Sequence, residues 1–222
     1  MIKAVIFDMY ETLITHYACP LYFSDEMAAD SGISIDKFRK EWRETEHERS
    51  VGTYTTDEVV AEILKHNHCY TEELLRNIMF KRIQTKEECF KHMHVGILPL
   101  LNALKERGIL IGLISNCFSE EAQVIRKSIL FPFFDGAVLS CEEGIEKPDE
   151  AIYYRCLDQL GVKSEECIYV GDGGSQELEA AKALGMLPLQ ALWYLTERSA
   201  HRIMKKEEFI QLMNPMDVIT YL

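Results

Sequence analysis

Short apolar runs recur along the chain, and they lack the alternation of polar and apolar residues that a half-exposed strand shows. Runs that are apolar on both faces and rich in branched residues are typical of strands buried within a parallel sheet. Helical patterns separate the later runs, as in repeated units of strand, helix and strand. We therefore predict strands at Ala4 to Phe7, Ile109 to Ile114, Gly136 to Leu139, Ile168 to Val170 and Leu187 to Leu192.

Residues with helix start and stop preferences mark the helices between these strands. Ser119 fits the N-cap of one helix, and Glu120 and Glu121 follow it in the first turn, where the helix dipole favours negative charge. Pro148 fits the first turn of another helix, and glycines follow the ends of three of the helical patterns. We predict helices at 96–107, from 119 onward, at 148–160 and at 175–184.

The stretch from 15 to 94 has a different character, because it offers one helical pattern after another and almost no strand signal. Thr55 to Glu58 and Thr85 to Glu88 fit the capping box that begins a helix. The chain is therefore predicted to be an α/β protein with a Rossmann-like parallel sheet at 1–14 and 95–222 and an inserted α-helical cap at 15–94.

Length and charge narrow the classes of partner. A chain of 222 residues that is 47% hydrophobic can bury a full core, with room for a small insertion. Its 36 acidic and 24 basic residues give a formal net charge of −12, which repels nucleic acid and anionic membranes, and no basic run is present to offset it. We expect no nucleic-acid partner, and a monomer or dimer.

The seven cysteines and the apolar stretches bear on location. The number of cysteines is odd and they are scattered, which fits reduced thiols better than a disulfide framework. No stretch reaches the roughly 20 apolar residues that a bilayer-spanning helix needs, and no cleavage site follows the apolar start of the chain. These features predict a cytoplasmic protein with no membrane partner.

Polar residues follow four of the predicted strands, at the edge of a parallel sheet where ligands bind. They are Asp8 after the first strand, Ser115 and Asn116 after the second, Lys147 after the third and a short loop, and Asp172 with Glu177 after the fourth. Carboxylates, a lysine and hydrogen-bond donors would converge there. This combination predicts a site for an anion and a metal ion.

These residues also carry a family resemblance that spans the entire chain. Asp8-x-x-x-Thr12, Ser115-Asn116, Lys147-Pro148 and Gly171-Asp172-x-x-x-x-Glu177 resemble the four motifs of the haloacid dehalogenase (HAD) superfamily of hydrolases, in order and at similar intervals. Each motif alone is weak evidence, whereas four of them at strand ends are specific. The predicted helical insertion resembles the family's C1-type cap, which lies between the first two motifs.

The resemblance implies a role for each residue. Asp8 would be the nucleophile, attacking phosphorus and forming an aspartyl-phosphate. Lys147 would place positive charge beside the nucleophile and the phosphoryl oxygens, and Ser115 and the backbone of Asn116 would donate hydrogen bonds to those oxygens. Thr12 would steady the first loop. The substrate would be a small phosphorylated metabolite.

The resemblance also implies a magnesium ion. Mg²⁺ removes the repulsion between a phosphate dianion and an attacking carboxylate, and it prefers oxygen ligands from one or two carboxylates plus waters. Asp8, Asp172, Glu177 and the backbone carbonyl of Tyr10 would supply those ligands. The cap would open to admit substrate and close to exclude water, with hinges near Thr15 and at 95–99.

Tyr10 departs from the commonest family pattern, in which a second aspartate stands two residues after the nucleophile as a general acid and base. Such a group is typically worth about 10²–10⁴-fold in rate. Glu11 is adjacent, but neighbouring side chains on an extended loop point to opposite sides. Tyrosine here is similar to the 2-haloacid dehalogenases, which need no metal, and the segment Glu41 to Arg43 is similar to a dehalogenase cap helix with a substrate-binding arginine.

The fourth motif favours the opposite interpretation, because dehalogenases tend to carry Ser and Asn where this chain has Gly171 and Asp172. Without a metal, clustered carboxylates would only raise one another's pKa. Metal-dependent phosphoryl hydrolysis is therefore the leading hypothesis. Carbon–halogen hydrolysis and a catalytically weak binding or regulatory role remain as alternatives.

The predicted cap holds further polar and aromatic groups. One is a set of possible zinc ligands, which otherwise are partly exposed helix residues: His66, His68, Cys69, Cys89, His92 and His94. The other is a set of aromatic residues that either line a substrate pocket or form the core of the cap: Trp42, Tyr54, Phe80 and Phe90. Near the C-terminus, the charged run Lys205 to Glu208 is predicted to be a solvated helix face.

Overall fold

The chain forms a single six-stranded sheet in which every pair of neighbouring strands is parallel. A computed structural model describes all residues, 1–222. The strands are β1 (Ala4–Phe7), β2 (Leu110–Ser115), β3 (Gly136–Leu139), β4 (Cys167–Gly171), β5 (Leu187–Ala191) and β6 (Ile210–Leu212). Their order is β3-β2-β1-β4-β5-β6, so β1 lies between β2 and β4. The predicted α/β class and its five strands are confirmed, whereas β6 was missed.

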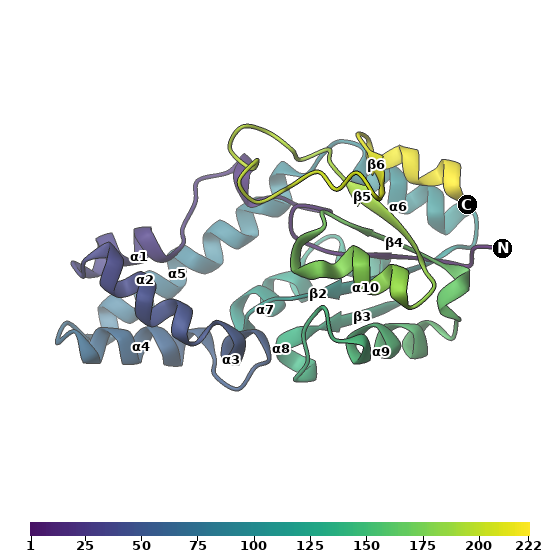
Figure 1. The fold of residues 1–222 in the computed structure, drawn as a ribbon. Helices are drawn as coiled ribbons and strands as arrows, with labels where there is room; N and C mark the ends of the chain where they lie inside the picture. Colours follow the sequence, from purple (N-terminus) through teal and green to yellow (C-terminus); the bar gives the residue numbers. More distant parts are fainter.

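Helices cover both faces of the sheet, because alternate residues of its strands point to opposite sides. Val5 and Phe7 pack in one apolar cluster with α6 (Ile97–Glu106) and α7 (Ser119–Lys127). Ala4 and Ile6 pack in another with α9 (Glu150–Leu160) and α10 (Glu177–Ala183). Figure 1 shows these layers. Both chain termini lie at the right of the view, at the end of the sheet opposite the helices of residues 24–89.

Five α-helices form an insertion between β1 and α6, and a helical insertion after the first strand is what the sequence predicts. They are α1 (Ser24–Ser31), α2 (Ile35–Glu44), α3 (Glu46–Ser50), α4 (Thr56–His66) and α5 (Glu72–Cys89). Four of them, α1, α2, α4 and α5, share an apolar cluster of their own, with Phe38, Leu64 and Ile78 among its buried members. Figure 1 shows this helical insertion beside the sheet, at the left of the view.

Shorter elements complete the chain. The 3₁₀ helices are η1 (His16–Ala18), η2 (Phe90–His92), η3 (Phe131–Phe133), η4 (Ser164–Glu166), η5 (Gly174–Gln176) and η6 (Pro215–Tyr221), and α8 (Ser140–Glu143) is a single helical turn. No helix combines the length and the apolar character needed to cross a bilayer.

The predicted helix start at Thr85 is wrong. Thr85 lies inside α5, and its hydroxyl donates to the carbonyl of Lys81 at 2.9 Å. The helix continues because its buried face, which includes Ile78, Arg82 and Lys86, repeats every four residues. Because two residues of that face are charged, the hydrophobicity of the sequence does not reveal that the helix continues. The start predicted at Thr55 is confirmed, since Thr55 caps α4 and Glu58 bonds back to it.

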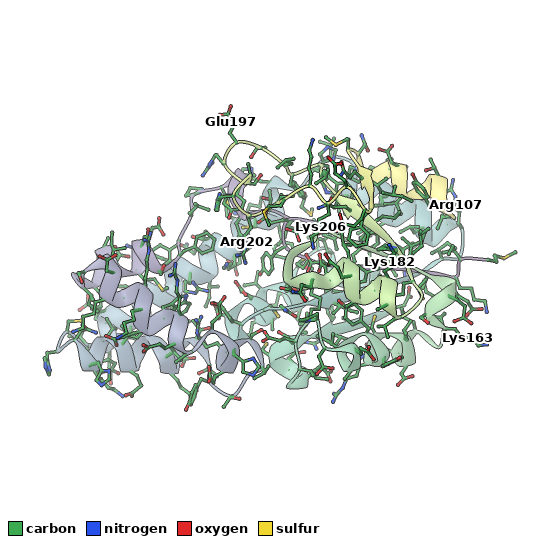
Figure 2. All side chains as sticks on the ribbon, in the orientation of Figure 1. Arg107, Lys163, Lys182, Glu197, Arg202 and Lys206 are labelled. Atoms are coloured by element: carbon green, nitrogen blue, oxygen red, sulfur yellow. The ribbon has the colours of Figure 1, made fainter.

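Three core predictions also need correction. The helix that ends at Leu160 begins at Glu150 with Asp149 as its N-cap, so Pro148 precedes it, after a cis peptide bond. Helix α7 begins at Ser119 itself, with Phe118 at the N-cap position. The run Lys205 to Glu208 is not helical; it lies in the connection from β5 to β6. Figure 2 shows Lys206 above α10, where its ammonium group contacts Glu179 at 2.5 Å.

The insertion is joined to α7 by charged groups that are buried. Arg82 of α5 donates to Glu120 at 2.8 Å, and the Lys86 ammonium lies 2.7 Å from Glu121. All four side chains are at most 9% exposed. Glu120 and Glu121 were predicted only as charges at a helix start. In the structure they are the partners of the charged face of α5, so α7 fixes that face against the core.

A second contact joins the insertion to α8. Gly52, just after α3, has a φ of 71°, and a Cβ built there would lie 1.9 Å from the carbonyl oxygen of Cys141. The backbones can approach this closely only because Gly52 has no side chain. The insertion therefore contacts the core at both α7 and α8.

Candidate active site

Asp8 stands on the loop that leaves β1 at the carboxyl edge of the sheet. Its amide donates to the carbonyl of Val170 at 2.9 Å, which extends the pairing of β1 with β4 by one residue. The loop then turns back on itself, since the amides of Leu13 and Ile14 both bond to the carbonyl of Met9. This turn presents the Asp8 carboxylate at the strand end and returns the chain toward the insertion.

Lys147 reaches this carboxylate from the loop before α9. Its ammonium group lies 2.6 Å from Oδ1 of Asp8 and 2.5 Å from Oε2 of Glu177, and it is buried. The side chain of Asn116 holds the Lys147 backbone from both sides: its amide nitrogen donates to the Lys147 carbonyl at 3.0 Å, and its oxygen accepts from the Lys147 amide at 2.8 Å. The structure thus brings the predicted residues of β1, β2 and the third loop together, with the Asn116 side chain orienting Lys147.

The loop after β4 supplies two more carboxylates. Asp172 Oδ1 accepts from the amide of Gly174 at 2.8 Å, and Glu177 Oε1 accepts from the amide of Gly173 at 3.1 Å. Gly171 is needed beneath them, because a Cβ there would lie 2.1 Å from Oε1 of Glu177. The Gly-Asp sequence therefore has a packing reason: it lets the first residue of α10 fold its carboxylate back against the strand end.

These three carboxylates form the one group in the structure whose spacing suits a metal ion. Ligand oxygens of Asp8, Asp172 and Glu177 lie within 4.8 Å of one another. Burial raises the pKa of Asp8 to about 7, although Lys147 opposes the shift. Burial and the neighbouring Glu177 and Asp8 raise the pKa of Asp172 well above its usual value. One lysine cannot neutralise three buried carboxylates, so the donor set fits a divalent cation that takes oxygen ligands.

Two hydroxyls stand at the carboxyl edge of the sheet, on β2 and on the Asp8 loop. Thr12 Oγ1 donates to Oδ2 of Asp8 at 3.3 Å, from one turn further along the same loop. Ser115, at the end of β2, is fully buried, and its hydroxyl has no hydrogen-bond partner. A buried hydroxyl without a partner is costly unless a ligand satisfies it. Ser115 therefore suits a ligand with oxygen acceptors at the strand ends.

Tyr10 turns its side chain toward the insertion. Its ring stacks on His16 at 4.4 Å between centroids, and its buried hydroxyl has no partner. Burial, with the nearby charge of Glu121, raises the pKa of Tyr10 well above the usual value, so the phenol keeps its proton at neutral pH. Glu11 has a φ of 60°, and its carboxylate accepts from Thr15 and from the amide of His16 at 3.1 Å. Glu11 is thereby held at the start of the insertion.

Two further polar residues support the cluster, and neither was predicted from the sequence. Tyr169, within β4, donates to Oε2 of Glu177 at 2.9 Å, and its oxygen lies 3.3 Å from the Lys147 ammonium. Gln190, fully buried in β5, donates to the carbonyl of Asp172 at 2.8 Å. The one signal in the sequence was a single amide within the apolar run Leu187 to Leu192.

A cavity of about 570 Å³ opens beside Lys147 between the core and the insertion. Charged and polar residues make up most of its lining. Its lining residues are Arg43, Glu46, His47, Asn116, Glu146, Lys147, Pro148, Ser175 and Gln176. Arg43, from the segment similar to a dehalogenase cap helix, therefore lines the cavity. Figure 2 shows another arginine, Arg202, on the loop after β5 on the side that faces the insertion.

The aromatic residues of the insertion lie elsewhere. Tyr54 and Phe80 are exposed, and Phe90 belongs to the core beneath the sheet. Trp42 packs against the guanidinium group of Arg49, which lies 3.4 Å from the ring centroid. The possible zinc ligands do not gather: Cys89 is buried beside Cys19, with 3.3 Å between the sulfurs, and His92 contacts Glu88.

Comparison with known proteins gives a family match over most of the chain. Residues 2–185 match a family described as haloacid dehalogenase-like hydrolase. A glyceraldehyde 3-phosphate phosphatase of Methanopyrus kandleri is 28% identical over 205 residues, which cover 86% of this chain and 84% of that protein. The N-acylneuraminate-9-phosphatase of Mus musculus is 26% identical over 110 residues, covering 45% of this chain and 44% of that protein.

Solved structures of several kinds share the fold. A HAD phosphatase from Thermococcus onnurineus has a TM-score of 0.70 at 18% identity, covering 99% of this chain and 97% of that one. The L-2-haloacid dehalogenase of Xanthobacter autotrophicus, with chloropropionic acid covalently bound, has a TM-score of 0.66 at 18% identity, with 98% and 97% covered. A HAD family enzyme of Bacteroides thetaiotaomicron, in complex with magnesium and inorganic phosphate, has a TM-score of 0.65 at 16% identity, with 91% and 100% covered.

Proposed function

This chain belongs to the haloacid dehalogenase-like hydrolases, and from that membership we propose that it hydrolyses phosphate monoesters of small polar metabolites with the help of Mg²⁺. The observation that carries the proposal is the cluster of Asp8, Asp172 and Glu177, whose ligand oxygens lie within 4.8 Å of one another beside a single lysine. An enzyme that worked without a metal would leave excess negative charge buried there. The names of the curated phosphatase relatives agree with this substrate class.

Magnesium would be held by the carboxylates of Asp8, Asp172 and Glu177 and by the backbone carbonyl of Tyr10. When bound, it supplies the positive charge that allows a phosphate dianion to approach the Asp8 carboxylate. Bound charge would also lower the pKa of Asp8 and Asp172, which burial raises in the free protein. Both carboxylates would then be ionised throughout the neutral pH range.

Asp8 is the nucleophile in this proposal. Its Oδ1 is held by Lys147 at 2.6 Å, whereas Oδ2 has only the 3.3 Å contact with Thr12, so Oδ2 is the oxygen free to attack phosphorus. A bond forms between Oδ2 and phosphorus as the bond from phosphorus to the leaving oxygen breaks. Water then attacks the aspartyl-phosphate, releases inorganic phosphate and restores the carboxylate.

Lys147 and Ser115 would stabilise the charge on the phosphoryl oxygens. The Lys147 ammonium is already held by Asp8 and Glu177, and the Lys147 backbone by two hydrogen bonds with the Asn116 side chain, so the group needs no rearrangement during the reaction. Ser115 would satisfy its free hydroxyl by donating to a phosphoryl oxygen. Thr12 would keep the Asp8 carboxylate in orientation.

The leaving oxygen has no evident proton donor among the residues beside Asp8. The Tyr10 phenol is buried, and burial and the charge of Glu121 raise its pKa well above the usual value, which makes it a poor acid. The Glu11 carboxylate is engaged by Thr15 and His16. Good leaving groups, or substrates that are protonated from solvent, should therefore react fastest.

The rest of the substrate would occupy the cavity beside Lys147. Because most of the residues that line this cavity of about 570 Å³ are charged or polar, it suits a hydroxylated or charged metabolite better than an aromatic one. We assign residues 15–94 the role of a cap over this cavity, with Arg43 supplying a positive charge in its lining for a further anionic group of the substrate.

The test is a paired turnover assay of the purified full chain. One arm uses p-nitrophenyl phosphate with Mg²⁺ or with EDTA, and the other uses 2-chloropropionate with halide detection. Phosphate release that EDTA stops and Asp8→Asn abolishes is the expected result. Asp158→Asn, an exposed change on α9, serves as the control that must keep full activity.

Tyr10 favours one second candidate function, the hydrolysis of carbon–halogen bonds. A halide ion leaves without being protonated, so this reaction does not need a proton donor at position 10. In that reaction Oδ2 of Asp8 would bond to carbon as the carbon–halogen bond breaks, and water would cleave the resulting ester. Halide release that is indifferent to EDTA would replace the phosphatase proposal with this one. Absence of turnover in both arms would instead favour a binding or regulatory role.

A further inference from the structure

The hydroxyl of Tyr194 joins three segments that are far apart in the sequence. Tyr194 stands after β5, and its hydroxyl donates to the carbonyl of Leu13 at 3.1 Å. The same oxygen accepts from the amide of His94 at 2.7 Å. Leu13 lies on the connection that leads from β1 into the helical insertion, and His94 lies on the connection that leads from the insertion back to α6. One side chain therefore bonds to both connections.

The environment of Tyr194 suits this double role. The residue is 8% exposed, and burial raises the pKa of Tyr194 to about 12. The phenol therefore stays protonated and can donate one hydrogen bond while it accepts another. The amide of His94 and the carbonyl of Leu13 have no other hydrogen-bond partner in the structure. Both backbone groups depend on this hydroxyl alone.

The preceding residue extends the contact toward the nucleophile. The indole nitrogen of Trp193 donates to the carbonyl of Thr12 at 2.8 Å. Thr12 in turn donates to Oδ2 of Asp8. Two consecutive residues after β5 thus hold two consecutive carbonyls of the loop that carries Asp8. The same pair of residues fixes the end of this loop and both entrances to the insertion.

We infer that Tyr194 is a positioning residue whose hydroxyl clips the two connections together and holds both of them against the core beside β5. The contacts that carry this inference lie within the chain itself, and they do not depend on which substrate the enzyme takes. Motion of the insertion would begin with release of the bonds at Tyr194, near the hinges predicted at Thr15 and at 95–99.

Tyr194→Phe tests the clip, because it keeps the ring and removes both hydrogen bonds. Amide hydrogen exchange of the full chain without substrate is the measurement. We expect the His94 amide to exchange at least about ten-fold faster, with faster exchange also between residues 12 and 19. The matched control is Tyr22→Phe, which removes a hydroxyl bond to Asp30 inside the insertion. It should leave exchange at His94 unchanged.

Equal exchange at His94 in wild type and Tyr194→Phe would overturn the clip. Faster exchange at His94 alone, with residues 12–19 unchanged, would overturn the coupling of the two connections. A variant that unfolds would show faster exchange in the sheet as well, and Tyr194→Met, which also lacks a hydroxyl but retains an apolar side chain, then repeats the comparison.

Kinetics test the positioning role separately. With p-nitrophenyl phosphate and Mg²⁺, kcat of Tyr194→Phe should fall about ten-fold while KM changes by less than about two-fold, because the Asp8 loop is less well placed. Faster exchange with unchanged kcat would reduce Tyr194 to a structural support and overturn its positioning role. Wild-type protein without turnover would contradict the proposed phosphatase, and the exchange comparison would still decide the clip.

Discussion

The ammonium group of Lys147 lies 2.6 Å from Oδ1 of Asp8, and neither side chain is more than 10% exposed. Ion pairs this deeply buried are held together by their whole surroundings rather than by their own attraction. Here the surroundings include Glu177 on the far side of the ammonium group. Removing either partner therefore changes the charge balance of the entire cluster.

Lys147→Met should lower kcat for p-nitrophenyl phosphate by about 10²–10³-fold, the usual effect of losing one fixed donor to a developing anion. The matched control is Lys163→Met, since that ammonium group is largely exposed on the far side of the core. Steady-state kinetics at saturating Mg²⁺ measure the effect. A rate within about two-fold of wild type would remove Lys147 from the catalytic machinery.

Asp8→Asn should stabilise the metal-free protein although it stops turnover, because it takes one charge out of a cluster of three carboxylates. The pKa of Asp8 is about 7 in the folded chain against an ordinary 3.8, so the folded state holds this proton more tightly. Ionised Asp8 therefore destabilises the folded wild-type protein, and this loss of stability is largest above pH 7 and shrinks as the pH falls toward 4.

Thermal unfolding in EDTA measures the stability of Asp8→Asn relative to wild type. Each kcal/mol of added stability should raise Tm by about 2–4 °C. The gain should be clear at pH 8 and small at pH 5. Addition of Mg²⁺ should raise the Tm of wild type more than that of Asp8→Asn. A variant that is less stable than wild type in EDTA at pH 8 would show that the cluster carries no excess charge.

Glu121→Gln should weaken the protein at neutral pH and have no effect in strong acid. Burial disfavours the charged form of Glu121, but Lys86 and Arg82 outweigh it and lower the pKa of Glu121 to about 2. A lowered pKa contributes stability above the ordinary value of 4.5, and this contribution is lost as the pH falls through about 2.

Urea unfolding at several pH values measures the free energy of unfolding of Glu121→Gln and of wild type, both at neutral pH and in strong acid. At pH 7 the variant should lose about 3–5 kcal/mol, because Lys86 is left buried without its partner. The difference from wild type should narrow steadily between pH 4.5 and 2. Glu73→Gln, exposed on α5, is the control and should follow wild type throughout. A difference that persists unchanged at pH 2 would point to packing rather than charge.

The kcat of the wild-type protein should depend strongly on how good the leaving group of the substrate is. Since the Tyr10 phenol keeps its proton, p-nitrophenyl phosphate should be turned over about 10²–10⁴-fold faster than an alkyl phosphate of similar size, the span that a general acid usually closes. Comparing kcat across a series of aryl and alkyl phosphates gives the slope. A flat series would reveal another proton donor at the site.

Gly52→Ala should separate the insertion from α8. A Cβ at position 52 would lie 1.9 Å from the Cys141 carbonyl, whereas one at Gly32 would meet no atom within 4 Å. Both glycines have a φ of 71°, so Gly32→Ala carries the same backbone strain without the clash. Urea unfolding should find Gly52→Ala the less stable of the two. Equal stabilities would mean that α8 moves aside freely.

Much of this site could be predicted because its residues follow strands. An apolar run such as Ala4 to Phe7 identifies a buried strand from composition alone, and parallel topology then places Asp8 at the ligand-binding edge. The same logic located Ser115, Lys147 and Asp172. Strand β6 escaped because it has three residues and Ile210 is exposed, which leaves no run to recognise.

Other features escaped because they depend on partners from distant segments. Arg82 and Lys86 look like solvated helix residues until α7 places Glu120 and Glu121 against them. Tyr169 looks like ordinary strand core, and its contacts with Glu177 and Lys147 exist only once α10 and the Lys147 loop have folded over β4. The periodicity of a sequence predicts which positions are buried, but it does not predict which charged group a buried side chain contacts.

The two ends of the helical insertion lie side by side, as the 3.3 Å contact between the sulfurs of Cys19 and Cys89 shows. Strands β1 and β2 already pair as neighbours, so the sheet does not need the insertion to complete it. Loop-closure entropy grows only slowly with length, so the sheet can carry insertions of very different sizes at this point. The core can therefore accept a different insertion between β1 and α6, by evolution or by protein engineering, and such an exchange would direct the same chemistry to another substrate.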